Sequence, residues 1–233
     1  MACRGAQMTC PGEGRARFVG HYAAAIAAKA VEPRAPLWAY ALAAQLVDVG
    51  WGALIITGAE RFSIDADLPG NALVLEHMPY THSLPAAAGW AVVGALATRL
   101  VLRLPWAAAI MVGAVVFSHW LLDFLVHRPD LALWFGGPKV GLGLWDYPVP
   151  EQAVEIGLIA MAASVWGWSR GRQGLGAVAA PVFIGFLVAL QIIAMLLPAD
   201  ADPLGTGVSA IGAFLAVTLA AAFADRRGRW GTR

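Results

Sequence analysis

Charged side chains are scarce in this sequence. Only 13% of its 233 residues are Asp, Glu, Lys or Arg, whereas 59% are hydrophobic. Soluble domains carry about 25% charged residues, enough to cover a globular surface. The scarcity of charge therefore excludes an ordinary soluble domain. It predicts a chain that crosses the lipid bilayer several times, because its apolar runs approach the roughly 20 residues that a spanning helix needs.

An excess of either sign of charge is also lacking. Sixteen Lys and Arg stand against 15 Asp and Glu, a formal net charge of +1. A protein that binds nucleic acid needs a basic face to neutralise phosphates, so we expect no nucleic-acid partner. Cysteine is limited to Cys3 and Cys10, which argues against a disulfide framework and a thiolate metal site. Residues 1–16 lack the apolar core of a signal peptide and are expected to form a flexible arm.

Long apolar runs bounded by Pro, Gly and charged residues predict a polytopic, all-α transmembrane bundle. About six spans are expected, at residues 37–58, 84–102, 106–127, 150–169, 177–197 and 205–224. A shorter helical segment, 18–30, would lie at the interface or insert halfway. We expect residues 17–160 to form the core with the functional site and residues 161–233 to form packing helices. Thr81 or Ser83 would cap the second span through its hydroxyl.

Basic residues favour alternate loops. Arg and Lys occur before the first span, between the second and third, between the fourth and fifth, and in the tail. The intervening loops are poorer in cations and hold Asp65, Asp67, Asp200 and Asp202. By the positive-inside rule this alternation predicts that both termini are cytoplasmic.

The third predicted span contains three ionisable residues at steps of four, His119, Asp123 and His127. Residues four apart share one face of a helix. Ionisable residues within spans are costly in lipid and usually face a protein interior. His119 and Asp123 would therefore coordinate one metal or bridge two. The alternative is a hydrogen-bonded pair in which Asp123 accepts from the His119 ring without a metal.

Other spans supply further candidates. Asp48 lies near the middle of the first span, His82 at the start of the second, and Glu155 in the first part of the fourth. A carboxylate at the depth of Asp48 must be protonated, paired or bound to a cation. Together with His119 and Asp123 these residues share the outer half of the bilayer, which predicts one metal site. Imidazole and carboxylate ligands favour zinc, with iron or manganese as second choices. For His82 the alternative is an interfacial polar anchor.

Several motifs point to a family. They are "FVGHYAAAIAAK", "LVDVGW", "MPYTHSL", "SHWLLDFLVHRPDL", "GGPKVGLGLW" and "VPEQAVE", and together they cover residues 18–160. The pattern resembles the YdjM-like bacterial inner-membrane proteins labelled membrane-bound metal-dependent hydrolases. More distantly, the H-x-x-x-D step is similar to that of the zinc-dependent phospholipase C group. The resemblance implies a set of metal ligands, namely His21, Asp48, His82, His119 and Asp123.

Two points depart from that pattern. Family members often carry two acids near the position of Asp48, as "PDxD", whereas this chain has Val47-Asp48-Val49. In addition, His21 falls in the arm that is expected on the cytoplasmic side, away from the other ligands. Either His21 is not a ligand, or the predicted boundary of the first span is wrong.

The leading hypothesis is a metal-dependent hydrolase of the bacterial inner membrane that acts on a lipid or lipid-linked phosphoester. It would use a divalent metal, zinc by preference. His77 or His127 would shuttle protons, and Lys139 would neutralise the leaving or transferred group. A second hypothesis is a non-catalytic accessory or structural subunit that packs against partner subunits of a membrane complex. A third is a proton or ion pathway through Asp48. In each case membrane lipid is an expected partner.

Overall fold

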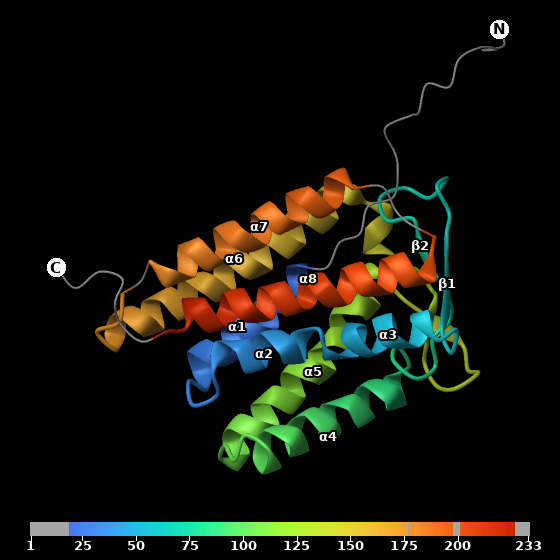
Figure 1. Ribbon diagram of the computed structural model, residues 1–233. Coiled ribbons are helices and arrows are strands. Elements are labelled where there is room, and N and C mark those ends of the chain that lie inside the picture. The colour runs from blue at the N-terminus through green and yellow to red at the C-terminus, as the bar shows by residue number, and fades with distance from the viewer. Residues whose placement is uncertain (1–18, 177, 198–200, 227–233) are drawn as a thin grey trace, which may run out of the picture.

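Helices dominate the computed structural model, which describes residues 19–176, 178–197 and 201–226 (Figure 1). The arm predicted for residues 1–16, with both cysteines, lies outside the described residues. Two short 3-10 helices are η1 (Val19–His21) and η2 (Leu144–Asp146). The α-helices are α1 (Tyr22–Val31), α2 (Leu37–Ala44), α3 (Leu46–Ile56), α4 (Leu84–Leu100), α5 (Trp106–Val126), α6 (Pro148–Arg172), α7 (Ala179–Leu196) and α8 (Pro203–Ala224).

Local signals set several helix ends. The Ser83 hydroxyl caps α4 by accepting a hydrogen bond from the Ala86 amide at 3.3 Å, as one of the two predicted alternatives requires. Asp202 caps α8 in the same way through the Gly205 amide at 2.7 Å. Such caps satisfy amides that have no partner inside the helix.

By length and composition the structure supports fewer spans than the expected six. In the described part of the chain, three helices (α5, α7 and α8) are long and apolar enough to cross a membrane. The predicted first span is two helices, α2 and α3, bent by 48° at a break, and this pair would make a fourth. Helix α4 has only 17 residues, and α6 includes two glutamates and two arginines. The protein is thus a helical membrane bundle, but a count of six is not confirmed.

Helix α1 is packed inside the bundle. It contacts α2, α5 and α6, and its Tyr22 and Ile26 side chains are fully buried. Its many alanines allow this close packing. At its end, Lys29 donates hydrogen bonds to the carbonyls of Pro33 and Ala35, and the chain turns back into α2. The expectation that His21 lies in an arm away from the other ligands was therefore wrong, because the start of α1 lies within the bundle. The predicted start of the first span, residue 37, agrees with that of α2.

Two short hairpins cover one end of the bundle, where only loops were expected. Strand β1 (Arg61–Ile64) pairs antiparallel with β2 (Leu73–His77), and β3 (Leu131–Ala132) pairs with β4 (Lys139–Val140). Beneath them, Leu75 and Leu131 join Trp51, Ile55 and Met78 in a small apolar core. We refer to this side, on the right in Figure 1, as the hairpin end.

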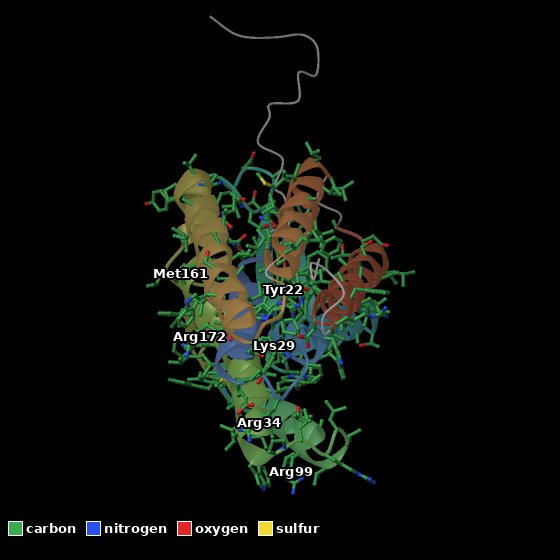
Figure 2. The ribbon with its side chains drawn as sticks, turned by 90° about the vertical axis from the view of Figure 1, so that its left-hand side faces the viewer. Tyr22, Lys29, Arg34, Arg99, Met161 and Arg172 are labelled. Carbon is green, nitrogen blue, oxygen red and sulfur yellow. The ribbon has the colours of Figure 1, made fainter. Side chains whose placement is uncertain are left out.

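The opposite end of the bundle is basic. It contains the turns between α1 and α2, α4 and α5, and α6 and α7. Lys29, Arg34, Arg99 and Arg172 mark it in Figure 2, which views the molecule from that side. We refer to it as the arginine end.

Candidate metal centre

The centre is built around α5. His119 and Asp123 lie one turn apart on its buried face, 1% and 3% exposed. Nε2 of His119 is 3.2 Å from Oδ2 of Asp123. His127 follows directly after the helix, and its Nε2 is 3.8 Å from Oδ1 of Asp123. The spacing of four therefore produces the predicted stripe.

The break between α2 and α3 brings in the second carboxylate. Helix α3 restarts after Gln45 and places Asp48 in its first turn, where the positive end of the helix dipole favours an anion. Oδ1 of Asp48 lies 3.4 Å from Nε2 of His119. The same break leaves the Ala44 carbonyl at a helix end, where it accepts a hydrogen bond from Nδ1 of His119 at 2.8 Å.

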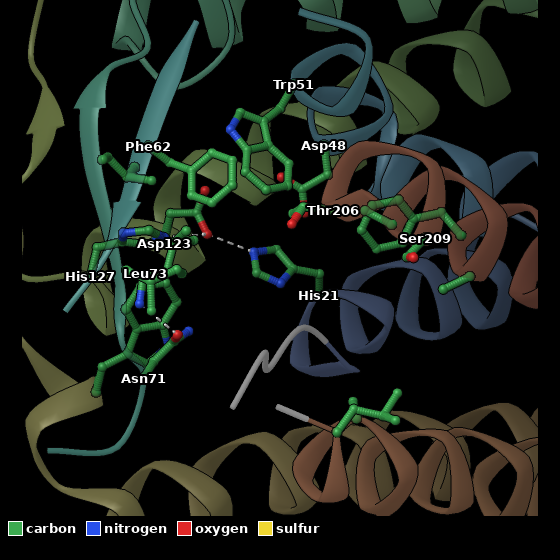
Figure 3. Close-up of a pocket in the computed structure, with 18 of the residues that line it drawn as sticks. His21, Asp48, Trp51, Phe62, Asn71, Leu73, Asp123, His127, Thr206 and Ser209 are labelled. Carbon is green, nitrogen blue, oxygen red and sulfur yellow. Dashed lines mark hydrogen bonds and ion pairs between the residues drawn. The ribbon is translucent and has the colours of Figure 1, made fainter. Parts of the chain in front are cut away.

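Two more histidines complete the centre. His82 precedes α4, and its Nε2 lies 3.2 Å from Oδ1 of Asp48 and 3.6 Å from Oδ2 of Asp123. His21, at the start of α1, places Nε2 3.0 Å from Oδ1 of Asp123 (Figure 3). Ligand atoms within 4.8 Å of one another form two groups that share His119. We refer to the five residues as the His–Asp cluster: His21, Asp48, His82, His119 and Asp123.

The hydrogen bonds of the imidazoles determine where their protons lie. Nδ1 of His119 must carry a proton, because its partner, the Ala44 carbonyl, can only accept. Nδ1 of His82 lies 2.7 Å from the Thr81 hydroxyl, which donates its own proton to Glu60 at 2.6 Å. The hydroxyl must therefore accept from His82. In their neutral forms, both histidines direct an Nε2 lone pair towards carboxylate oxygens.

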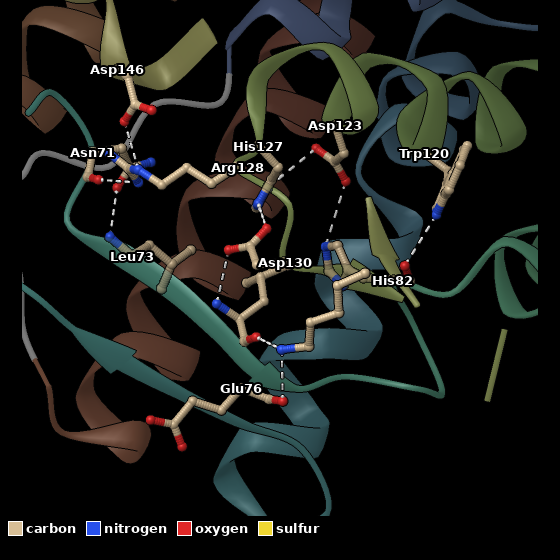
Figure 4. Close-up of polar contacts among 12 residues, drawn as sticks. Asn71, Leu73, Glu76, His82, Trp120, Asp123, His127, Arg128, Asp130 and Asp146 are labelled. Atoms are coloured by element: carbon tan, nitrogen blue, oxygen red, sulfur yellow. Dashed lines mark hydrogen bonds and ion pairs between the residues drawn. The ribbon is translucent and has the colours of Figure 1, made fainter. Parts of the chain in front are cut away.

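His127 follows the same rule. Its Nδ1 lies 3.1 Å from Oδ1 of Asp130, an acceptor, while the other oxygen of Asp130 accepts from the Leu75 amide (Figure 4). The His127 ring also packs on Trp145, with ring centroids 3.8 Å apart. Nε2 of His127 therefore faces Asp123 from the rim of the cluster.

Lone pairs that face carboxylates repel unless a proton or a metal ion lies between them. Nε2 of His119 and Oδ2 of Asp123 are buried and have no hydrogen-bond partner within the described ranges. Leaving a buried polar group unsatisfied costs about 1–3 kcal/mol. The N···O distances in the cluster are 3.0, 3.2, 3.2, 3.4 and 3.6 Å. Ligand atoms about 2.0–2.1 Å from a tetrahedral zinc lie roughly 3.3 Å apart, so the donor set fits such an ion.

The electrostatic environment of His82 also favours positive charge. Burial lowers the pKa of this imidazole, but a hydrogen bond to Asp48 and the negative charges of Asp123 and Asp48 raise it more. The net result is a pKa above the ordinary value of 6.5. The site thus attracts positive charge, and a metal ion would compete with the proton for the same nitrogen.

The cluster opens into a cavity of about 630 Å³. Its walls come from α3, α7, α8, the β1–β2 hairpin and the segment around Trp145. Small-molecule sites commonly measure about 300–1,000 Å³. The candidate metal centre therefore adjoins a space large enough for a substrate.

Four predicted site residues lie outside the cluster: His127 at its rim, and Glu155, His77 and Lys139 elsewhere. Glu155 lies beside Gly20, and its Oε2 accepts a hydrogen bond from Gln191 at 3.2 Å. His77 is exposed on β2 and is not among the residues that line the cavity. Lys139 donates to the carbonyls of Leu75 and Glu76, so its ammonium links the two hairpins. Of the proposed proton carriers, only His127 reaches the cavity.

Sequence reasoning missed the groups that orient the imidazoles. Glu60, which is 1% exposed, accepts hydrogen bonds from the amides of Tyr80 and Thr81 and from the Thr81 hydroxyl. The only local signal was a hydroxyl residue directly before a candidate ligand. Nearby, Arg128 pairs with Asp146 at 2.6 Å and donates to two backbone carbonyls, which joins the loops around the cavity (Figure 4).

The fold and the cluster define a helical membrane protein with a buried group of candidate metal ligands. The chain belongs to the YdjM inner membrane protein family, whose model matches residues 17–198. The matched region includes every residue of the His–Asp cluster and ends before α8. Neither the curated proteins nor the solved structures gave a significant match to this chain.

Proposed function

We propose that this protein is a membrane-bound metal-dependent hydrolase whose His–Asp cluster holds a divalent metal, zinc by preference. One observation carries the proposal. The Nδ1 protons of His82 and His119 are committed to other acceptors, so their Nε2 atoms converge on the carboxylates of Asp48 and Asp123. A set of imidazole nitrogens and carboxylate oxygens without thiolates is typical of catalytic zinc sites.

When bound, zinc would lower the pKa of a coordinated water and polarise the bond under attack. The residues around it have distinct tasks. Ala44 and Thr81 orient two imidazoles, and such outer partners tune metal affinity. His127 lines the cavity with Nε2 facing the cluster and Nδ1 bonded to Asp130. It is therefore positioned to accept a proton and return it to a leaving group.

The location of the cluster favours a substrate that reaches it from the membrane, such as a lipid or lipid-linked phosphoester. The cluster lines the same cavity as the β1–β2 hairpin, and the basic turns lie at the opposite end of the bundle (Figure 2). The positive-inside rule assigns the arginine end to the cytoplasm, so the centre would face the outer half of the bilayer. Helix α8 ends at the arginine end, which supports a cytoplasmic C-terminus.

Metal analysis tests the proposal directly. Wild-type protein is purified in mild detergent without added zinc and analysed by inductively coupled plasma mass spectrometry. We expect bound metal in the wild type and at least about a tenfold loss in His119→Ala, since even outer-shell changes cost 10–100-fold. His77→Ala is the matched control, because His77 is exposed outside the cluster. Folded wild-type protein without metal would contradict the proposal.

Hydrolysis is tested separately. The metal-loaded protein in vesicles is incubated with phospholipids labelled in the head group, and the release of labelled product is measured with and without a chelator. We expect release that requires metal and is lost in Asp123→Asn. A protein that binds metal but releases no product from phospholipids or lipid-linked phosphates would favour the accessory-subunit hypothesis.

A further inference from the structure

The cavity beside the His–Asp cluster has a second, apolar wall. Leu197, the residue that follows α7, lines it together with three residues of the helix itself, namely Leu190, Ile193 and Ala194. Their spacing of three and four places them on one face of the helix. Ile193 and Leu197 are 53% and 60% exposed, so this stripe is not sealed against a neighbouring helix.

Helix α8 contributes the facing stripe. Six of its residues line the cavity: Gly205, Thr206, Ser209, Ala210, Ala213 and Phe214. Five of the six are small, and none on either stripe is charged. Figure 3 shows Thr206 and Ser209 on one side of His21 and the β1–β2 hairpin, with Phe62 and Leu73, on the other.

Ala210 packs at the edge of the apolar core around Trp51, but the small residues of this stripe do not make the closest helix contact of α8. That contact belongs to another face of α8, where Gly207 meets α3 so closely that an added Cβ would lie 2.6 Å from the Gly52 carbonyl oxygen. Small residues at helix contacts normally allow such an approach in membranes. Along the cavity the small side chains instead leave the space between α7 and α8 open.

We propose that this space binds one hydrocarbon chain of a lipid whose phosphoester lies at the His–Asp cluster. Both stripes belong to helices that are long and apolar enough to cross a bilayer, so bilayer lipid is the available occupant. The cavity has an apolar part, between α7 and α8, and a polar part, at the His–Asp cluster. A lipid, which has an apolar chain and a polar head group, would fit both parts. The position of the head group rests on the proposed function, but the chain site can be tested by binding alone.

The experiment uses full-length protein in vesicles of phosphatidylethanolamine that include an analogue with a photoreactive diazirine at the end of one acyl chain. Crosslinked peptides are identified by mass spectrometry. We expect adducts on the α7 and α8 stripes. Ala210→Trp and Ala213→Trp should fill the space and reduce labelling by about tenfold, as steric mismatch does in apolar pockets.

Ala216→Trp is the matched control, because Ala216 is an exposed residue of α8 that does not line the cavity. It should label as the wild type does. Equal labelling of the Ala210 and Ala216 variants, or adducts spread over the whole lipid-facing surface, would overturn the proposal. So would a stoichiometric second polypeptide that crosslinks to both stripes, because a partner helix would then be the occupant.

Metal content, measured on the same samples, separates the two proposals. Bound metal with no labelling of the stripes would refute the chain site and leave the metal centre intact. Specific labelling without metal would support the chain site and refute the proposed metal-dependent function. Retained metal in Ala210→Trp would also show that the substitution has not disrupted the fold.

Discussion

The two ends of the bundle provide different partners for carboxylates that are wholly or mostly buried. At the arginine end, Asp225 is paired with Lys29 at 2.9 Å and also accepts a hydrogen bond from the Leu37 amide. At the hairpin end, Asp48 and Asp123 meet imidazole nitrogens, and two of these imidazoles have already committed their Nδ1 protons. The chain thus supplies a permanent cation to one acid. Within the described residues, Asp48 and Asp123 have no such side chain beside them and are arranged to bind an added metal ion.

A structural acid and a candidate ligand differ in the basic groups that they meet. Both kinds are shielded from water, and both contact basic side chains. The difference lies in the second nitrogen of each histidine. A lysine is charged under ordinary conditions, whereas a neutral histidine with its Nδ1 proton committed offers only a lone pair to a carboxylate. Variants at the two ends can therefore test the distinction.

The largest effect is expected for Asp123→Asn, compared with Asp225→Asn. Asp123 contacts four imidazoles, and its amide analogue has no negative charge with which to hold a metal. We expect metal content to fall by about 100-fold in Asp123→Asn, and to be unchanged in Asp225→Asn. Elemental analysis of both purified variants measures this. Similar metal loss in the two variants would contradict the prediction that Asp123 is a metal ligand and Asp225 is not.

At the arginine end, removal of the acid should lower the stability of the fold and leave the metal content unchanged. Asp225→Ala leaves the Lys29 ammonium and the Leu37 amide without a shared acceptor. We expect a loss of about 1–3 kcal/mol in the free energy of unfolding, the typical cost of a partner removed from a buried polar group. Thermal unfolding in detergent, with metal content as the control, measures it. An unaltered melting temperature would show that this ion pair does not hold α8.

A smaller effect on metal affinity is expected for Thr81→Val, which has nearly the same shape. It removes the hydroxyl between Glu60 and Nδ1 of His82, so the imidazole loses its orientation. We expect about tenfold weaker zinc binding in a chelator competition. Thr57→Val is the control, because Thr57 is exposed and its hydroxyl donates to the Leu54 carbonyl of α3. Equal zinc affinity of the two variants would show that Thr81 does not support the metal centre.

The smallest effect concerns pH. A side-chain hydrogen bond from Arg34 is the main cause that lowers the pKa of Glu32, and it outweighs the opposing effect of burial. A lowered pKa in the folded state means that Glu32 adds stability above its unfolded pKa, and that this stability is lost as the pH falls through the folded pKa. Glu32→Gln should therefore flatten the acid limb of a melting-temperature profile slightly. Because the Arg34 side chain is 54% exposed, salt should weaken the effect.

Much of the site could be predicted from local spacing. The stripe of His119 and Asp123 follows from helix geometry, because residues four apart share a face. Asp48 and His82 were recognised because a polar group in an apolar run must have a partner. Glu155 satisfied the same reasoning, yet it lies beside Gly20 and bonds to Gln191. Depth in the bilayer does not reveal the direction in which a side chain points.

The sequence by itself determined the helical membrane fold, the family and most of the cluster, because apolar length and a period of 3.6 residues are local properties. Only the tertiary structure decided that α1 turns inward to deliver His21, that the first span breaks at Gln45, and that Glu60 supports Thr81. It also decided that α7 and α8 line a cavity. These features depend on contacts between segments far apart in the chain, and such contacts leave no periodic signal in the sequence.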